Sequence, residues 1–131
     1  MSGFMLDTDT VSFAFRGQGH VTTHLLNHRP SEISISSVTL AELRYGADMK
    51  RSRKLHGLID TFVEAVVVLP FDQAAADRFG TVAATLARRG VPIGEFDTLI
   101  AAHALARRLT LVTNNTKHFS RVVGLAMENW I

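Results

Sequence analysis

Short apolar runs alternate with longer helical stretches along this chain, and this alternation restricts the fold more than any other feature. Four runs have the character of buried strands, most of them rich in β-branched residues: Phe4–Leu6, Ile33–Ile35, Ala65–Leu69 and Thr110–Val112. The stretches around them predict helices at about Val11–Arg16, Val21–Asn27, Val38–Met49, Arg53–Val63, Gln73–Arg89 and Phe96–Arg107. Strands alternating with helices favour an α/β fold, with a parallel sheet flanked by helices on both faces.

The longest predicted helix has apolar residues at the three-and-four spacing of a buried face: Ala76, Phe79, Val82, Ala83 and Leu86. Gly90 and Pro92 then end that helix. No repeat, low-complexity tract or linker divides the sequence. We therefore expect one domain over residues 1–131, which is long enough to bury a hydrophobic core.

Composition excludes several classes of protein. The chain has no cysteine, which rules out disulfides, thiolate catalysis and Cys-based metal sites and fits a reducing cytosol. The N-terminus lacks the pattern of a signal peptide, and the apolar stretch Ala65–Phe71 is too short to span a bilayer. We expect a cytoplasmic protein that makes no membrane contact.

Acidic residues stand where predicted strands give way to helices. Asp7 follows the strand Phe4–Leu6, and Glu42 and Asp97 lie in the first turns of two predicted helices. In parallel sheets the functional crevice lies beyond the carboxyl ends of the strands, so these side chains are expected to meet there. Converging carboxylates repel one another unless cations bind, and Mg²⁺ or Mn²⁺ suits a site made of oxygen ligands. This pattern points to metal-assisted hydrolysis of a phosphate ester.

Each acid also has a purely structural interpretation. Asp7 and Asp9 could cap the following helix, and Glu42 stands three residues after Thr39 in a capping-box pattern. Asp97 could be a first-turn acid favoured by the helix dipole. The small apolar residues Ile100–Ala102 place Asp97 toward the interior, however, where an unpaired charge is costly and a bound cation would offset that cost.

Four segments together closely resemble the VapC-type toxins of bacterial toxin–antitoxin pairs, which are small PIN-domain ribonucleases. The resemblance runs from about Met5 to Trp130 and keeps the family's order and spacing of motifs. The segments are Met5–Thr10, Ser37–Gly46, Pro92–Ala104 and Leu111–Phe119. Any one of these motifs would be weak on its own, and the four together are specific.

The resemblance implies roles for individual residues. Asp7, Glu42 and Asp97 would be the metal-binding carboxylates, and the segment Thr113–Asn115, with Asn115 as the catalytic candidate, would supply the fourth position. Two departures from the family pattern leave the number of metal ions open. Asp9 stands where the family more often has Asn or Ser, and Asn114 and Asn115 are neutral where many members carry an acid nearby.

The implied activity is Mg²⁺- or Mn²⁺-dependent cleavage of single-stranded or loop RNA by water. The products would carry a 5′-phosphate and a 3′-hydroxyl, because the ribose 2′-hydroxyl is not the nucleophile. The resemblance favours the anticodon loop of an initiator tRNA as target, with a ribosomal RNA loop as the alternative. It also implies a cognate VapB-type antitoxin and a homodimer formed through helical faces.

Several further residues have two interpretations. Thr8 and Thr113 could hydrogen-bond the carboxylates or the scissile phosphate, or could cap the backbone. Arg44 could contact phosphate or form a surface ion pair. The chain carries a formal charge of +2, and its densest basic patch, which includes Lys50 and Arg51, could bind RNA or be a solvated helix end.

Other functions compete with the ribonuclease hypothesis. Asp7 and Asp9 after a strand also resemble the first motif of haloacid-dehalogenase-type phosphatases, in which the first Asp is the nucleophile. That fold would leave Glu42 without a role, and the chain is short for it. A receiver-type module would need a late Lys-Pro that is absent. A catalytically weak relative that only binds its partner is the third alternative, supported by Asn114 and Asn115.

We expect structural roles for four of the histidines and for the tryptophan. His20, His24 and His28 recur every four residues and are expected to form an exposed polar stripe on a helix. His103 follows Asp97 on a different face of its helix and is expected to be structural. Trp130 is expected to pack in the core or in an interface.

Overall fold

Residues 3–131, the part of the chain that the computed structural model describes, form a five-stranded sheet in the order β3-β2-β1-β4-β5. Every neighbouring pair of these strands is parallel, as the sequence predicted. The strands are β1 (Phe4–Leu6), β2 (Ile33–Ser36), β3 (Val67–Leu69), β4 (Thr110–Val112) and β5 (Met127–Glu128). The central strand β1 pairs with β2 and β4, so the carboxyl ends of all three lie together.

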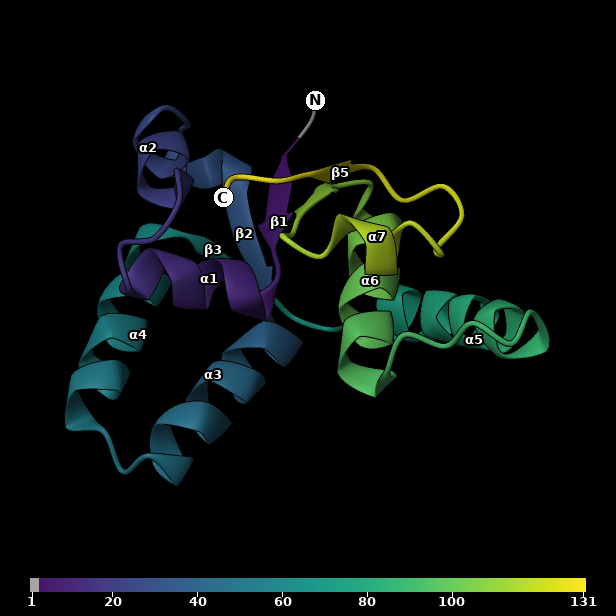
Figure 1. The fold of residues 1–131 in the computed structure, drawn as a ribbon, viewed down its shortest axis with the longest axis horizontal. Coiled ribbons are helices and arrows are strands. Elements are labelled where there is room, and N and C mark those ends of the chain that lie inside the picture. The colour runs from purple at the N-terminus through teal and green to yellow at the C-terminus, as the bar shows by residue number, and fades with distance from the viewer. Residues whose placement is uncertain (1–2) are drawn as a thin grey trace.

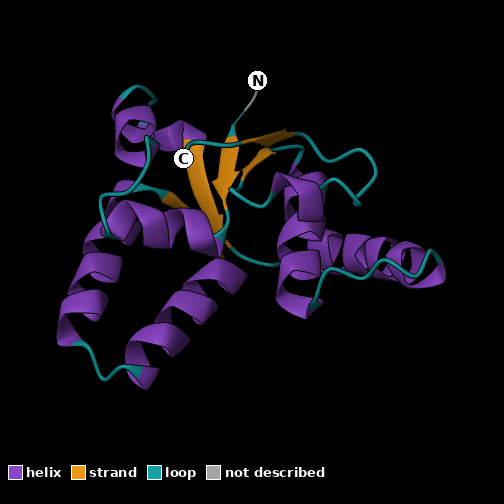
Figure 2. Ribbon diagram, in the orientation of Figure 1, coloured by secondary structure: helices purple, strands orange, loops and turns teal. Residues whose placement is uncertain are grey.

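Helices cover both faces of the sheet, as predicted, and Figure 1 shows them in two groups. The first group is α1 (Thr8–Phe15), α2 (Val21–Leu26), α3 (Ser37–Met49) and α4 (Arg53–Ala65). The second group is α5 (Gln73–Arg88), α6 (Glu95–Arg107) and the single turn α7 (Thr116–Phe119). A 3₁₀ turn at Pro30–Glu32 precedes β2. Figure 2 shows the strands between the two groups. No helix within residues 3–131 is long and apolar enough to cross a membrane.

Two hydrophobic cores lie on opposite faces of the sheet because successive residues of a strand point to opposite sides. Leu6 and Val112 belong to the core beneath α1–α4, where they join Val11 and Ile59. The preceding residues, Met5 and Leu111, belong to the core beneath α5 and α6. The strands β1 and β4 are therefore covered on both faces, which explains why they read as continuous apolar runs.

The structure corrects several predicted boundaries. Ala65 ends α4 and β3 begins only at Val67, so the predicted strand Ala65–Leu69 was two residues too long. The first helix begins at Thr8 rather than Val11. The predicted buried face of α5 was one residue off at its start, because Ala75 is buried and Ala76 is exposed. Either alanine satisfies the three-and-four spacing, so the pattern could not distinguish them.

Candidate active site

Asp7 lies at the carboxyl end of β1 and is buried, with 4% of its surface exposed. Its Oδ1 accepts a hydrogen bond from the backbone N–H of Thr10 at 2.9 Å, so Asp7 is the N-cap of α1. Burial raises the pKa of Asp7 above its ordinary value, and hydrogen bonds from Thr10 and Thr113 only partly oppose this. Asp7 is therefore a helix cap whose ionised form is costly to bury.

Glu42 lies on α3 and is half-buried. Thr8 Oγ1 donates a hydrogen bond of 2.6 Å to Glu42 Oε1, which joins the start of α1 to α3. Burial raises the pKa of Glu42, and the charges of Asp97, Asp9 and Asp7 raise it further. The predicted capping box with Thr39 was wrong, because α3 begins at Ser37 and its cap is Ser36.

Asp97 lies in the first turn of α6, which begins after Gly94 in a backbone conformation with φ of +93° that suits glycine. Its Oδ2 lies 3.3 Å from Nε2 of His118 on α7. Burial raises the pKa of Asp97, the charge of His118 opposes this, and the charges of Asp7 and Asp9 raise it again. The prediction that Asp97 faces the interior is consistent with this burial.

These carboxylates lie close enough to disfavour one another's ionised forms, although they come from three elements. Asp9 is exposed, and its charge raises the pKa of Asp7, Glu42 and Asp97, so its carboxylate lies near theirs. Within residues 3–131, no three Asp, Glu or His side chains form a ready-made metal cluster. Oxygen donors with raised pKa values nevertheless match the chemistry of a hard divalent cation, which would relieve their repulsion.

His118 is the residue of this site that sequence reasoning missed. Its Nε2 lies 2.6 Å from the carbonyl oxygen of Ile93, which can only accept, so Nε2 carries a proton. The same nitrogen faces Asp97 Oδ2. The only sequence signal was its position three residues after Asn115 in the fourth motif, and nothing local in that motif pairs it with Asp97.

The segment after β4 brings backbone and side-chain polar groups to the edge of the site. Thr113 is fully buried, and its Oγ1 accepts a hydrogen bond from the backbone N–H of Asn115 at 2.9 Å. Asn115 is exposed and precedes α7. Asn114 is also exposed, and its Oδ1 accepts a hydrogen bond from Asn129 at 3.3 Å. Thr113 therefore contacts both Asp7 and the loop that carries Asn115.

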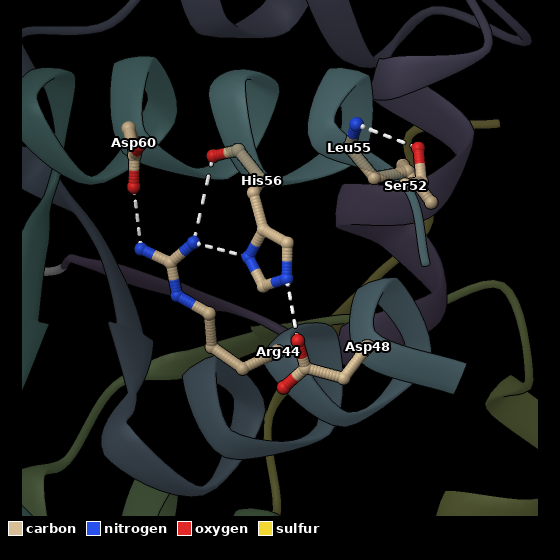
Figure 3. A network of polar contacts seen from close by, with 6 residues as sticks. All are labelled: Arg44, Asp48, Ser52, Leu55, His56 and Asp60. Carbon is tan, nitrogen blue, oxygen red and sulfur yellow. Dashed lines mark hydrogen bonds and ion pairs between the residues drawn. The ribbon is translucent and has the colours of Figure 1, made fainter. Parts of the chain in front are cut away.

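Arg44 forms the ion pair that the sequence left open. Its Nη2 lies 2.5 Å from Asp60 Oδ1, and its Nη1 lies 2.8 Å from His56 Nδ1 (Figure 3). His56 Nε2 in turn lies 2.8 Å from Asp48 Oδ1, so these four side chains connect α3 to α4. Lys50 and Arg51 lie at the exposed end of α3 without an ion pair among the described residues.

Two hollows open beside Glu42. A cavity of about 180 Å³ between α1, α3 and α4 is lined at one end by Thr8 and Glu42 and elsewhere by apolar and basic side chains, including Arg16, Lys50 and Leu55. A wider hollow of about 550 Å³ is lined by Thr8, Ala41, Glu42, Tyr45 and Phe96. Glu42 therefore lies between a groove with basic residues and a hollow with exposed aromatic residues.

The predicted roles of the remaining histidines and of Trp130 were partly right. Trp130 is buried in the core, and the ring of His24 stacks on it at 4.7 Å between centroids. His28 also stacks on Trp130, at 5.3 Å. The exposed-stripe prediction was therefore wrong for His24 and His28, which are half-buried, and right for His20. His103 is fully buried, which agrees with a structural role.

The chain resembles a well-populated group of known proteins. Residues 4–125 match the model of the family described as PIN domain. A protein of Shigella flexneri named tRNA(fMet)-specific endonuclease VapC is 43% identical over 131 residues, which cover 99% of each chain. A Haemophilus influenzae protein named Ribonuclease VapC2 is 35% identical over 132 residues, which cover all of both chains.

Solved structures give the same result. A chain in the crystal structure of DNA-bound VapBC from Salmonella typhimurium has a TM-score of 0.93 and 38% identity, with all of both chains covered. A chain in the structure of VapBC2 from Rickettsia felis, bound to a promoter DNA fragment, has a TM-score of 0.88 and 34% identity, with 98% of each chain covered. None of these matches supports the phosphatase interpretation of Asp7 and Asp9.

Proposed function

Since the chain belongs to the PIN-domain family, and within it to the VapC-type proteins, we propose that it is a divalent-metal-dependent endoribonuclease that acts as the toxin of a toxin–antitoxin pair. The observation that carries the proposal is the set of carboxylates at the carboxyl ends of β1, β2 and β4. Asp7, Glu42 and Asp97 are wholly or partly buried, and each has a raised pKa. A purely structural cluster of this kind would destabilise the fold without benefit.

In this proposal Asp7, Glu42 and Asp97 hold Mg²⁺ or Mn²⁺, and Asp9 adds negative charge at the rim. A bound cation would supply Lewis-acid chemistry, lowering the pKa of water and offsetting charge at phosphorus. The protein's own contribution is to orient the carboxylates. The backbone N–H of Thr10 holds Asp7, Thr8 holds Glu42 and His118 holds Asp97. Such hydrogen bonds to ligands typically matter for affinity or activity by about 10–100-fold.

Thr113 and Asn115 would act at the substrate side of the site. The Thr113 hydroxyl interacts with Asp7, and it also accepts a hydrogen bond from the backbone of Asn115. This leaves the amide of Asn115 exposed at the start of α7, where it can donate to a phosphate oxygen or orient water. Because water is the nucleophile in this mechanism, the products carry a 5′-phosphate and a 3′-hydroxyl.

The substrate that we propose is a single-stranded loop of structured RNA, with the anticodon loop of initiator tRNA first and a ribosomal RNA loop second. Two relatives that are 43% and 38% identical over nearly their whole lengths are named tRNA(fMet)-specific endonucleases. Exposed Lys50 and Arg51 at the end of α3 would supply phosphate contacts. The ion pair with Asp60 makes Arg44 a weaker candidate for this role.

The partner that we propose is a VapB-type antitoxin that covers the groove beside Glu42. Several similar solved structures are VapBC complexes. The groove between α1, α3 and α4 offers such a segment apolar walls at Leu43, Leu55 and Ile59, with Arg16 and Lys50 at its rim. We also propose a homodimer formed through helical faces and a cytoplasmic location, in keeping with a toxin that acts on cellular RNA.

The decisive experiment treats total bacterial RNA and purified initiator tRNA with antitoxin-free protein and Mg²⁺ or Mn²⁺, and maps the new ends. We expect discrete cuts with 5′-phosphate ends that EDTA and Asp97→Asn both abolish. Glu95→Gln is the matched control, because Glu95 is an exposed acid in the same helical turn. Ends with 2′,3′-cyclic phosphates would contradict the proposed mechanism. Absence of cleavage with intact antitoxin binding would favour the catalytically weak relative.

A further inference from the structure

His103 is a buried polar residue to which the proposed mechanism assigns no role. It lies on α6 with no exposed surface, among the apolar residues Ile100, Ala101 and Ala104. Its ring packs edge-on against Phe71 with 5.4 Å between centroids. Any apolar side chain of similar size would suit such surroundings better than an imidazole.

The hydrogen bond of His103 connects the helix that carries Asp97 with the start of the helix that carries Glu42. Its Nδ1 lies 2.8 Å from Oγ of Ser36, which is also fully buried. Ser36 ends β2 and caps α3, because its Oγ accepts a hydrogen bond from the backbone N–H of Val38 at 3.1 Å. The bond therefore joins the middle of α6 to the first turn of α3.

The proton positions in this contact follow from the partners. Ser36 Oγ already accepts a hydrogen bond from the backbone N–H of Val38. If its own proton is donated to His103 Nδ1, the hydroxyl has a partner both as acceptor and as donor. His103 is then neutral with its proton on Nε2, in agreement with burial lowering its pKa. That Nε2 is the one buried side-chain nitrogen or oxygen of residues 3–131 that lacks a hydrogen-bond partner. An unpaired buried N–H is destabilising, so the presence of a histidine at this position calls for another explanation.

The spacing along both helices supplies that explanation. Glu42 is six residues after Ser36 on α3, and Asp97 is six residues before His103 on α6. Six helical residues span about 9 Å, so each carboxylate lies a short, rigid distance from the shared hydrogen bond. A shift of one helix against the other at this contact would therefore alter the separation of the two carboxylates.

We propose that His103 is a positioning residue whose hydrogen bond to Ser36 sets the spacing between Glu42 and Asp97. This inference rests on the proposed function, because its consequence is the affinity of the carboxylates for a divalent cation. His103 acts through Ser36 and α3, and it contacts neither the cation nor the RNA.

Two substitutions separate the hydrogen bond from the packing. His103→Leu fills a similar volume but removes the bond to Ser36. His103→Asn leaves a small cavity but keeps an amide near the position of Nδ1. If His103 has only a structural role, Mn²⁺ affinity should change in parallel with stability. His103→Asn would then lose at least as much affinity as His103→Leu, because it leaves a cavity. A positioning histidine predicts the reverse order for Mn²⁺ affinity.

The experiment measures Mn²⁺ binding by calorimetry together with thermal unfolding for wild type, His103→Leu, His103→Asn and Ser36→Ala. We expect His103→Leu to bind Mn²⁺ about tenfold more weakly and His103→Asn to stay within about twofold of wild type. Ser36→Ala should weaken Mn²⁺ binding as much as His103→Leu does. The double variant Ser36→Ala/His103→Leu should bind Mn²⁺ no more weakly than either single variant. Wild-type affinity in His103→Leu would overturn the inference, as would affinities that follow melting temperatures.

A metal-free readout distinguishes failure of this inference from failure of the proposed function. If wild type binds no Mn²⁺, the proposed function fails, and NMR shifts of Glu42 and Asp97 in the metal-free variants still test His103. We expect the NMR signals of Glu42 and Asp97 to shift in His103→Leu and to stay near their wild-type chemical shifts in His103→Asn. Unchanged shifts in His103→Leu would overturn the positioning role independently of any metal.

Discussion

The side chain of Asp7 both caps α1 and faces the other carboxylates, and these two roles have opposite effects on stability. Asparagine caps a helix about as well as aspartate, so Asp7→Asn keeps the hydrogen bond from Thr10 and removes the buried charge. We therefore expect metal-free Asp7→Asn to be more stable than wild type at neutral pH by about 1 kcal/mol. Urea denaturation of both proteins measures this difference.

The pH dependence of that difference follows from the sign of the pKa shift. The folded-state pKa of Asp7 is raised above its ordinary value of 3.8, so folding favours the protonated carboxyl. Below the ordinary pKa the carboxyl is protonated in both states, and its burial causes no electrostatic loss of stability. The loss grows as pH rises from the ordinary pKa through the folded-state pKa, and it is complete above the folded-state pKa. The advantage of Asp7→Asn should therefore grow from pH 3 to pH 7 and be lost when Mn²⁺ stabilises wild type. A constant advantage would show that burial of the charge is not its cause.

At the residue scale, the sequence predicted where two of the acids lie in the fold better than it predicted their hydrogen-bond partners. Asp7 follows a strand and Asp97 lies in the first turn of a helix, as predicted. The prediction that Glu42 lies in a first turn was wrong, because α3 begins at Ser37 and Glu42 is its sixth residue. The contact between His118 and Asp97 joins two motifs that are separate in the sequence, and no local pattern around either residue predicts it. The hydrogen bond from Thr8 to Glu42 was one of two open interpretations, because a threonine after a strand is also a common backbone cap.

Among the elements, α3 and α4 are connected by polar contacts between four of the side chains drawn in Figure 3. Arg44 donates to Asp60 and to His56, and His56 contacts Asp48. We expect Arg44→Ala and Asp60→Ala each to lower stability by about 0.5–1 kcal/mol, since Asp60 is largely exposed and water screens the pair. A double-mutant cycle by urea denaturation gives their coupling.

The same variants test whether Arg44 binds RNA. If its guanidinium stays with Asp60, Arg44→Ala should leave the salt dependence of RNA cleavage unchanged, whereas Lys50→Ala should reduce the slope. Asp60→Ala is the control, because it frees Arg44 without removing it. An equal change in slope for Arg44→Ala and Lys50→Ala would assign Arg44 to the RNA-binding surface.

At the element scale, prediction succeeded where the apolar period was long or the strand was central. The helices α3, α4, α5 and α6 were placed within two residues at each end, and β1 and β4 were placed without error. The two-residue strand β5 and the single turn α7 were missed, because neither is long enough to show a period. The sheet pairs β5 with β4, and that long-range pairing defines a strand which its own sequence does not.

For the molecule as a whole, the C-terminal segment of the described chain packs against β1, the central strand of the sheet. Trp130 is buried against Phe4 of β1, with 5.2 Å between ring centroids, and His24 of α2 stacks on it. The backbone N–H of His20 donates to the carbonyl oxygen of Trp130 at 2.8 Å. One aromatic side chain thus joins the segment after β5 to β1 and α2, three parts of the chain that are distant in sequence.

This contact predicts a large stability loss from a position far from the carboxylates. Trp130→Ala should lower the free energy of unfolding by about 3–5 kcal/mol, since it removes a fully buried aromatic side chain. Trp130→Phe keeps the stacking and loses the hydrogen bond from Nε1 to Glu128, so it should cost about 1–2 kcal/mol. Urea denaturation followed by circular dichroism measures both. A loss below about 1 kcal/mol for Trp130→Ala would mean that the core beneath α1–α4 is stable without the terminal segment.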